Sequence, residues 1–252
     1  MDKELITKLT KKYRRADRSL FLLDYDGTLV DYTPMPGTDP LPEKIFDILN
    51  RIIYSQRSRV FIITGRSYSD IETIFNHLPV SIIAEHGAMI RVNGKWESQI
   101  NDDCLWKESV IPVLNQITLS CPESFIEEKP YSLAWHYRNT ESRSGYAISR
   151  ELITILGKKV ALHDLKILDG NKVVEIMNNE LGKGQATKRL LERNNFDFIL
   201  SVGDDQTDEE MFEFLISNPD AFTIKVGNGE TLAKDKLSGF NDVISLLKHL
   251  SA

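Results

Sequence analysis

The sequence predicts an α/β protein in which a smaller sheet is inserted into a larger parallel one. Near both ends of the chain, short apolar runs of strand length alternate with helical patterns, and this order builds a parallel sheet covered by helices on both faces. Between about residues 89 and 178, a hairpin signal and strand patterns typical of an antiparallel sheet replace the alternation. We therefore expect a core domain of residues 1–88 and 179–252 and an inserted α/β domain of residues 89–178.

The first part of the core is expected to supply three strands and the helices between them. A helical period runs through residues 2–16, and an apolar strand follows at Ser19–Leu23. A loop rich in turn-forming residues, 33–42, then leads to the next helix. The segments that follow alternate in the same way: a helix at Glu43–Tyr54, a strand at 60–63, a helix at 69–76 and a strand at 80–84.

The insert and the last part of the chain differ in their patterns. Asn93-Gly94 lies between two short strand-like segments and is a strong hairpin signal. The stretches "SLAWHYR" and "KVVEIM" are expected to be strands of the insert, with helices at about 105–120 and 145–156. From Gly182 onward the core alternation resumes, with a helix in "KGQATKRLLERN", a strand, acidic loop and helix in "DFILSVGDDQTDEEMFEFL", and a strand in "AFTIKVG".

The composition restricts the classes of function. The 252 residues carry a net charge of −6 and no long basic run, so the sequence gives no electrostatic support for a nucleic-acid partner. The two cysteines, Cys104 and Cys121, have neither a metal-binding spacing nor a disulfide framework. No apolar stretch approaches the roughly 18–20 residues of a membrane span, and the N-terminus lacks the apolar segment of a signal peptide. We expect a cytoplasmic protein with no membrane partner.

Two aspartates, Asp24 and Asp26, follow the first strand in "LLDYDGTLVDY". Side chains alternate along an extended chain, so both carboxylates are expected on one face. Carboxylates that face one point repel each other, and they need a cation, a shared proton or a chemical role. Helix capping is the alternative explanation for aspartates in a turn.

A second acidic segment follows the strand in "ILSVGDDQTDEEM". It contains Asp204, Asp205 and Asp208, of which Asp208 alone could be only a helix cap. Two further strands end in polar residues, Thr64 and His86. In open parallel sheets, ligands bind at the carboxyl ends of the strands. The polar residues at four strand ends are therefore expected to form one site.

A cluster of carboxylates needs positive charge nearby. Two unit charges ~4 Å apart cost about 4 kcal/mol at an effective dielectric constant of 20. Oxygen ligands favour a hard divalent cation, and Mg²⁺ is the usual ion where phosphate completes the coordination shell. No histidine or cysteine cluster supports zinc. Lys183, at a helix start, could supply a fixed positive charge, although a single lysine is as often only a solvated surface residue.

These residues resemble a known set of motifs. "DYDGT", Thr64, Lys183 and "GDDQTDEEMF" resemble, in this order, the four motifs of the haloacid dehalogenase-type phosphohydrolases. The stretches "LLDYDGTLVDYTPMP", "TGR", "AEHGAMIR", "SLAWHYR", "VVEIMNNELGKG" and "GDDQTDEEMF" together resemble the trehalose-6-phosphate phosphatases over almost the whole chain. The resemblance implies a Rossmann-like haloacid dehalogenase core with a parallel sheet, and an inserted α/β cap domain with a small antiparallel sheet.

The resemblance also implies a role for each core residue. Asp24 is expected to attack phosphorus and form an aspartyl phosphate, and Asp26 to protonate the leaving sugar oxygen and then activate water. Mg²⁺ would be held by Asp24, the main-chain carbonyl of Asp26, and Asp204. Thr64 would donate a hydrogen bond to a phosphoryl oxygen, and Lys183 would offset charge on the phosphate and on Asp24.

Other core positions are expected to support this group. The resemblance implies that Asp205 and Asp208 orient the metal-bound waters and Lys183. Gly27 would leave room for the phosphate and let the chain turn. Arg66 and His86, at the ends of core strands, are expected either to touch the substrate or only to brace the loops.

The insert is expected to act as a cap that excludes water and brings specificity groups to the core. Paired acids and bases suit the many hydroxyls of a disaccharide, and the alternative for each is a surface ion pair. Lys172 matches the family less closely than the others. The candidate sugar-binding residues are Glu127, Lys129, Arg138, Lys172 and Glu175.

The resemblance implies a Mg²⁺-dependent phosphatase that makes trehalose and phosphate from trehalose 6-phosphate. One alternative is another capped sugar phosphatase, acting on sucrose phosphate or mannosyl-3-phosphoglycerate. A different class is a catalytically silent, regulatory phosphatase-like domain, although the predicted nucleophile Asp24 is present. The lead-in "YRRADRSLFLLDYDGTL" resembles the junction before the phosphatase domain of bifunctional synthase/phosphatases, and this resemblance implies a trehalose-6-phosphate synthase domain or partner.

Overall fold

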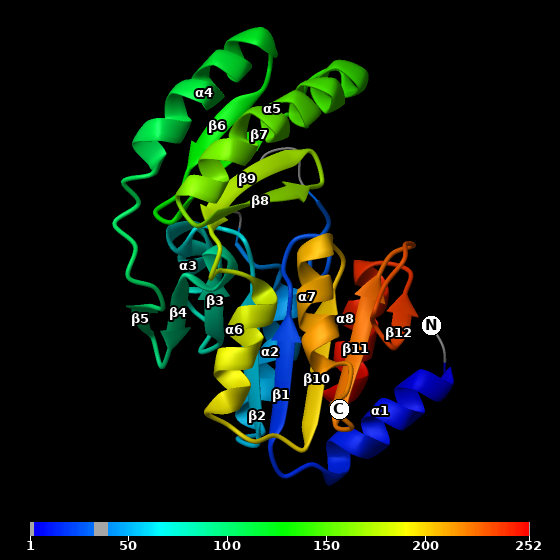
Figure 1. Ribbon diagram of the computed structural model, residues 1–252. Helices are drawn as coiled ribbons and strands as arrows, with labels where there is room; N and C mark the ends of the chain where they lie inside the picture. The colour runs from blue at the N-terminus through cyan, green and yellow to red at the C-terminus, as the bar shows by residue number, and fades with distance from the viewer. Residues whose placement is uncertain (1–2, 33–39, 252) are drawn as a thin grey trace. The chain divides into compact units, whose positions relative to one another are not determined.

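A computed structural model describes residues 3–32 and 40–251, and most of the loop expected at 33–42 falls outside this range. The chain divides into two compact units (Figure 1). Unit 1 contains residues 1–99 and 182–252, and unit 2 contains residues 100–181. Each unit has its own sheet, one mostly parallel and one antiparallel, which confirms the predicted fold class.

Unit 1 is built on a large sheet. Its described strands are β1 Ser19–Leu23, β2 Ser58–Ile63, β3 Ser81–Ala84, β4 Met89–Val92, β5 Lys95–Ser98, β10 Phe198–Gly203, β11 Ala221–Val226 and β12 Asp235–Leu237. They lie in the order β12-β11-β10-β1-β2-β3-β4-β5. All neighbours from β12 to β3 pair in parallel, whereas β4 and β5 add an antiparallel edge.

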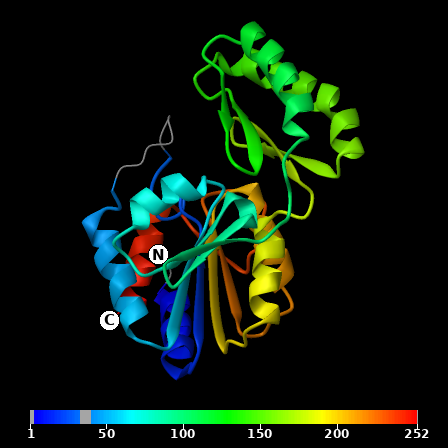
Figure 2. The ribbon, with the colours of Figure 1, turned by 90° about the vertical axis from the view of Figure 1, so that its left-hand side faces the viewer.

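Helices cover both faces of this sheet. The described helices of unit 1 are α1 Lys3–Arg15, α2 Glu43–Tyr54, α3 Tyr68–Phe75, α6 Lys183–Glu192, α7 Gln206–Leu215 and α8 Phe240–Leu250, with a 3₁₀ turn, η1, at Glu85–Gly87. Figure 2 shows α2 and α8 on one side of the sheet and α6 and α7 on the other. In β1, Leu20 and Leu22 pack towards α6 and α7, and Phe21 and Leu23 pack towards the opposite layer. Burial on both faces explains why this strand is apolar throughout.

The hairpin β4–β5 corrects the expected domain boundary. The structure places the boundaries after residues 99 and 181, whereas the sequence suggested 88 and 178. Strand β4 pairs antiparallel with β3, Ile90 opposite Ile83, and Trp96 of β5 packs against the core of unit 1. The hairpin thus extends the large sheet instead of starting the small one, because antiparallel strands can join the edge of a parallel sheet.

Unit 2 is an antiparallel sheet with two helices. Its elements are α4 Lys107–Ser120, β6 Phe125–Glu128, β7 Ser132–His136, α5 Ser142–Leu162, β8 Leu165–Gly170 and β9 Val173–Asn178. The strand order is β6-β7-β9-β8. Leu114 of α4, Leu152 of α5 and Trp135 of β7 belong to one buried apolar cluster, so both helices pack on the same face. Helix α5 is longer than the expected 145–156, and the sequence patterns did not indicate β6 or β8.

Among the described residues of both units, no helix is long and apolar enough to span a membrane.

Candidate active site

The carboxyl ends of the central strands bring the predicted core residues together. Strand β1 pairs with both β10 and β2, with Leu23 opposite Val202 and opposite Ile62. The residue after β1 is Asp24, and the residue after β2 is Thr64. The loop after β10 begins with Asp204. Parallel pairing places these chain ends at one edge of the sheet, as the sequence predicted.

Lys183 lies between two of the carboxylates. As the first residue of α6 it follows Gly182, whose φ of 150° suits a glycine. Its Nζ donates to Asp24 Oδ1 at 2.7 Å and to Asp208 Oδ1 at 2.8 Å, and only 3% of the lysine is exposed. Burial lowers the pKa of Lys183, but the two carboxylates raise it more, and the net shift is upward. Lys183 is therefore a buried, charged residue and not a solvated surface lysine.

Asp24 is buried beside more negative than positive charge. Burial raises its pKa well above the usual carboxyl value; Lys183 opposes this, and Asp208 and Asp204 add to it. The single lysine therefore does not compensate the carboxylates around it. A further cation at this point would favour the ionised form of Asp24.

Asp208 shapes the acidic loop from inside. Its Oδ2 accepts hydrogen bonds from the main-chain N–H groups of Asp204 and Asp205, both at 3.0 Å. Asp205 is the N-cap of α7 and forms a capping box with Asp208, and it accepts from the N–H of Gln206 at 2.7 Å. Asp208 thus belongs to the capping box of α7 and is also a partner of Lys183, so a capping role and a role in the site are compatible.

Asp204 is held by two hydroxyl groups. Thr28 Oγ1 donates to its Oδ1 at 3.1 Å, and Tyr32 Oη donates to its Oδ2 at 2.7 Å. Burial raises the pKa of Asp204, the hydrogen bond from Tyr32 lowers it, and Asp208 raises it, with an upward net shift. The sequence patterns did not indicate Tyr32, because it lies in a loop where no periodicity predicts the direction of a side chain.

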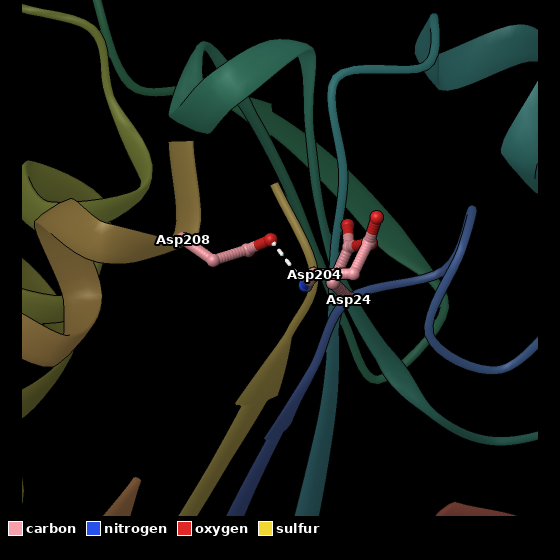
Figure 3. Close-up of side chains that lie close together, drawn as sticks. All are labelled: Asp24, Asp204 and Asp208. Carbon is pink, nitrogen blue, oxygen red and sulfur yellow. Dashed lines mark hydrogen bonds between the residues drawn. The ribbon is translucent and has the colours of Figure 1, made fainter. Parts of the chain in front are cut away.

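The carboxylates could hold a metal ion. One oxygen each from Asp24, Asp204 and Asp208 lie within 4.8 Å of one another (Figure 3). The oxygens of Asp208 accept from the charged Lys183 and from two main-chain N–H groups, whereas those of Asp204 accept from the neutral hydroxyl groups of Thr28 and Tyr32, which do not offset its charge. Asp24 and Asp204 are therefore the better candidate ligands. A Cβ added at Gly27 would lie 2.4 Å from Asp204 Oδ2, and its φ is +83°. Gly27 therefore leaves the space that Asp204 occupies, and the oxygen donors fit a hard divalent cation.

Asp26 is paired with Arg66 in a bidentate contact. Arg66 Nε and Nη2 donate to the two carboxylate oxygens at 2.7 and 2.6 Å. The guanidinium also lies over the ring of Tyr25, 5.1 Å from its centroid. Thr64 Oγ1 accepts from the N–H of Arg66 at 3.2 Å. Arg66, expected either to touch substrate or to brace a loop, thus fixes the orientation of Asp26.

His86 lies in a strained turn that joins two parts of the site. Glu85, His86 and Gly87 have φ values of 49°, 53° and 102°, in the left-handed region that favours glycine. The N–H of His86 donates to the carbonyl of Thr64 at 3.1 Å, and its carbonyl accepts from Gly182 at 2.7 Å. His86 thus braces the residues next to Thr64 and Lys183, and backbone strain of this kind occurs often at functional sites.

In unit 2 the predicted sugar-binding residues separate into two groups. Glu127 and Glu175 stand opposite Ala134 on neighbouring strands, and Lys129 forms a 2.8 Å ion pair with Glu175. Burial raises the pKa of Glu127, but a hydrogen bond with His136 and the charge of Lys129 lower it more, so that the net shift is downward.

The second group lies at the other end of β7. Arg138 donates to the carbonyl of Asn171 at 2.7 Å, and Lys172 donates to Ser142 Oγ at 3.1 Å. The structure therefore brings Glu127, Lys129 and Glu175 together, while Arg138 contacts the loop between β8 and β9 and Lys172 of that loop contacts the start of α5.

Comparison with known proteins identifies the family. The family model described as trehalose-phosphatase matches residues 22–241. The chain belongs to the trehalose-phosphatase family. It is 36% identical over 251 residues to a bifunctional trehalose-6-phosphate synthase/phosphatase of Thermoproteus tenax, covering 99% of this chain and 34% of that protein. The chain spans about a third of the length of the curated relatives it matches.

Solved structures support the same assignment. The C-terminal domain of the trehalose-6-phosphate phosphatase of C. albicans superimposes with a TM-score of 0.92 at 27% identity, covering 98% of this chain and 96% of that one. A haloacid dehalogenase-like hydrolase of B. subtilis has a TM-score of 0.64 at 17% identity, with 91% and 99% covered. The second similarity shows the fold alone. The resemblance found in the motifs is confirmed for the family and for the haloacid dehalogenase-like fold.

Proposed function

We propose that this member of the trehalose-phosphatase family is a Mg²⁺-dependent phosphatase that hydrolyses trehalose 6-phosphate to trehalose and phosphate. The observation that carries the proposal is the position of Lys183, which holds Asp24 and Asp208 at 2.7 and 2.8 Å at the edge of the sheet. A catalytically silent domain has no need of a buried lysine fixed against a buried aspartate. Family membership supports the substrate.

In the proposed reaction, a carboxylate oxygen of Asp24 attacks phosphorus while the sugar oxygen leaves with a proton from Asp26. Water then attacks the aspartyl phosphate and loses a proton to Asp26, which frees phosphate and Asp24. Lys183 keeps Asp24 oriented, and Arg66 holds Asp26 at the site through a bidentate contact, from which one Asp26 oxygen is released when it carries the proton for the sugar oxygen. Thr64 supplies a hydroxyl to a phosphoryl oxygen.

The proposed Mg²⁺ would be held by Asp24, Asp204 and the main-chain carbonyl of Asp26. A bound divalent ion would neutralise charge on the phosphoryl group. Thr28 and Tyr32 orient the Asp204 carboxylate through the hydrogen bonds they donate. Asp208 fixes the loop that carries Asp204 and also fixes Lys183.

We propose that unit 2 contributes groups that recognise the sugar. Glu127, Lys129 and Glu175 offer paired acids and a base, a combination that matches hydroxyl groups, which both donate and accept. Arg138 and Lys172 stay candidates for the same role.

The proposal extends to partners and location. Because one relative of this chain is named a bifunctional trehalose-6-phosphate synthase/phosphatase and others are named trehalose-phosphate synthases, a trehalose-6-phosphate synthase domain or separate partner is proposed for it too. A cytoplasmic location stays a prediction.

Phosphate release from a panel of sugar phosphates tests the proposal. The panel contains trehalose 6-phosphate, sucrose 6-phosphate, glucose 6-phosphate and mannosyl-3-phosphoglycerate, each with Mg²⁺ and with EDTA. We expect a strong preference for trehalose 6-phosphate that EDTA abolishes. Preference for another sugar phosphate would support the proposed phosphatase mechanism but contradict trehalose 6-phosphate as the substrate. Inactivity on all members of the panel would favour the silent regulatory domain.

A further inference from the structure

A cavity lies in unit 1, away from the carboxylates. Its volume is about 380 Å³, and strands β2, β3 and β4 and helix α6 line it. Ile90 and Val92 of β4 contribute accessible apolar surface, whereas Phe61 and Ile83 of the sheet and Leu190 of α6 line it as buried core residues. None of Asp24, Lys183 and Asp204 is among the lining residues. The cavity is therefore separate from the proposed phosphatase site.

The walls of this cavity are positively charged. Arg59 of β2, Arg189 of α6 and Arg193, the C-cap of α6, line it, and the lining contains no Asp or Glu among the residues that the structure describes. Arg189 and Arg193 are four residues apart, so they project from the same side of the helix. The chain as a whole has a net charge of −6, so a general excess of basic residues does not explain this cluster.

Two of the arginines donate hydrogen bonds to groups beside the cavity. Arg59 Nη1 donates to Asn194 Oδ1 at 3.0 Å, and Arg189 Nη2 donates to the carbonyl of Gly87 at 3.3 Å. Guanidinium groups around one cavity repel each other, and an anion between them removes that repulsion while using their planar donors in pairs.

We propose that this cavity, called the arginine cavity below, binds a small organic anion: a phosphate, sulfonate or carboxylate group attached to a flat apolar body. The anionic group would contact Arg59, Arg189 and Arg193, and the apolar body would lie on Ile90 and Val92. The volume falls in the range of about 300–1,000 Å³ typical of small-molecule sites, which combine apolar walls with a few charged groups.

The arginine cavity is connected to the phosphatase site through one turn of chain. Arg189 contacts Gly87, and the preceding residue, His86, is hydrogen bonded to Thr64 and to Gly182. A ligand that binds Arg189 would therefore change the contact of Arg189 with the turn at Gly87, and this turn is hydrogen bonded to both sides of the phosphatase site. Coupling of two separate sites changes each affinity by a limited, equal factor.

Fluorescence titration with 8-anilinonaphthalene-1-sulfonate tests the proposal, since this probe joins a sulfonate to an aromatic body. We expect one site per chain, with a dissociation constant raised about tenfold or more in Arg59→Gln/Arg193→Gln, as expected for lost charge-assisted hydrogen bonds. The matched control is Arg51→Gln/Arg143→Gln, which removes two exposed arginines elsewhere and should leave binding unchanged. Single Arg193→Gln provides the readout if the double variant unfolds.

Two further arms locate the probe and its contacts. The neutral analogue N-phenyl-1-naphthylamine should bind about tenfold more weakly, because it lacks the charge-assisted contact. As the concentration of inorganic phosphate is raised in the presence of Mg²⁺, the probe's dissociation constant should change only up to a plateau, as expected for two separate but coupled sites. A shift that grows without limit would place the probe in the phosphatase site and overturn the proposal.

Other outcomes would also overturn it. Equal binding by wild type and Arg59→Gln/Arg193→Gln, or equal binding of the neutral analogue, would show that the arginines do not recognise an anion. Sedimentation velocity covers a different occupant: if wild type forms dimers that Arg59→Gln/Arg193→Gln or the probe dissociates, the cavity is part of an interface with a second copy.

Discussion

At the scale of single residues, the pair formed by Asp24 and Lys183 makes the sharpest prediction. Asp24→Asn keeps the shape of the side chain and removes the nucleophile, so phosphate release should fall by about 10⁴-fold or more. The folded state should be retained, because a neutral side chain at this buried position avoids the desolvation that raises the pKa of Asp24. Phosphate release and thermal unfolding measure the two effects.

The control for this variant is Asp47→Asn, which changes an exposed aspartate of α2 and should leave turnover unchanged. Turnover by Asp24→Asn near the wild-type rate would reject the aspartyl-phosphate mechanism.

Tyr32 should affect the metal site without touching phosphorus. Its hydroxyl donates to Asp204 Oδ2 at 2.7 Å, and partners that orient a metal ligand typically contribute about 10- to 100-fold to metal affinity. Tyr32→Phe should therefore raise the Mg²⁺ concentration needed for half-maximal activity by about tenfold, with turnover at saturating Mg²⁺ largely kept. Tyr54→Phe, at a tyrosine that is 73% exposed, is the control. An unchanged Mg²⁺ requirement would mean that Tyr32 does not orient Asp204.

Glu127 should act on substrate affinity and not on the chemical step. Glu127→Gln can keep the 2.7 Å contact with His136 but removes the negative charge offered to a sugar hydroxyl. We expect KM for trehalose 6-phosphate to rise about tenfold, the loss expected for one hydrogen bond to a charged group, with kcat nearly unchanged. Glu151→Gln on the exposed side of α5 serves as control. A fall in kcat with constant KM would argue against sugar recognition.

The site residues that follow a strand directly could be predicted from the sequence. Asp24, Thr64 and Asp204 follow apolar strands directly, and parallel pairing then brings them to one edge. The bidentate contact between Arg66 and Asp26 and the hydrogen bond from Tyr32 could not be predicted, because both depend on loop paths and side-chain directions.

At the scale of elements, the hairpin β4–β5 shows what pattern reasoning can decide. Asn93 and Gly94 have φ values of 53° and 75°, the positive pair that a two-residue hairpin turn requires. The turn was therefore predictable, but the sheet that the hairpin joins was not, because alternation does not identify a strand's neighbour. Helix α8, Phe240–Leu250, could have been predicted, since its buried residues Val243, Leu246, Leu247 and Leu250 follow a helical period.

Arg91 is the residue that fastens this hairpin to the core. Its Nη2 donates to three main-chain carbonyls between residues 75 and 80, and its Nη1 forms a 2.7 Å ion pair with Glu72. Arg91→Met should lower the free energy of unfolding by about 3 kcal/mol, because it takes the donor away from three buried main-chain carbonyls; the ion pair adds little, since the Glu72 side chain is 40% exposed. Denaturant unfolding measures this loss.

The exposed Lys95 of the same hairpin offers the matched control, since Lys95→Met removes a positive charge from the surface and should change the free energy of unfolding by less than about 0.5 kcal/mol. Equal effects of the two variants would show that Arg91 does not fasten the hairpin.

At the scale of the whole molecule, unit 1 gathers charge of both signs on its large sheet. Asp24, Asp204 and Asp208 concentrate negative charge at the carboxyl edge, and Arg59, Arg189 and Arg193 concentrate positive charge around the arginine cavity. Packing requires apolar residues inside the strands. Polar residues can therefore differ only at positions beside open space, at the strand ends and along α6. Function in this fold thus depends on residues that contribute little to the apolar core.

The carboxylate cluster should make stability depend on pH and Mg²⁺ together. The folded pKa values of Asp24 and Asp204 are raised, burial being the largest cause. Their contribution to stability is full below the unfolded carboxyl pKa of about 3.9 and is lost as pH rises through the raised folded values. Without metal, stability should therefore fall with rising pH, and Mg²⁺, which binds the ionised carboxylates, should restore it.

Thermal unfolding with MgCl₂ and with EDTA, at about pH 5.5 and about pH 8, measures this dependence. We expect Mg²⁺ to raise Tm by about 2–4 °C more at the higher pH, the shift that about 1 kcal/mol produces in a chain of this size. Asp204→Asn removes one proposed ligand and one of the raised carboxyl pKa values, so in that variant the Mg²⁺ effect should shrink at both pH values. A Mg²⁺ effect that is equal at both pH values, or larger at the lower one, would mean that protons and the metal ion do not compete for these carboxylates.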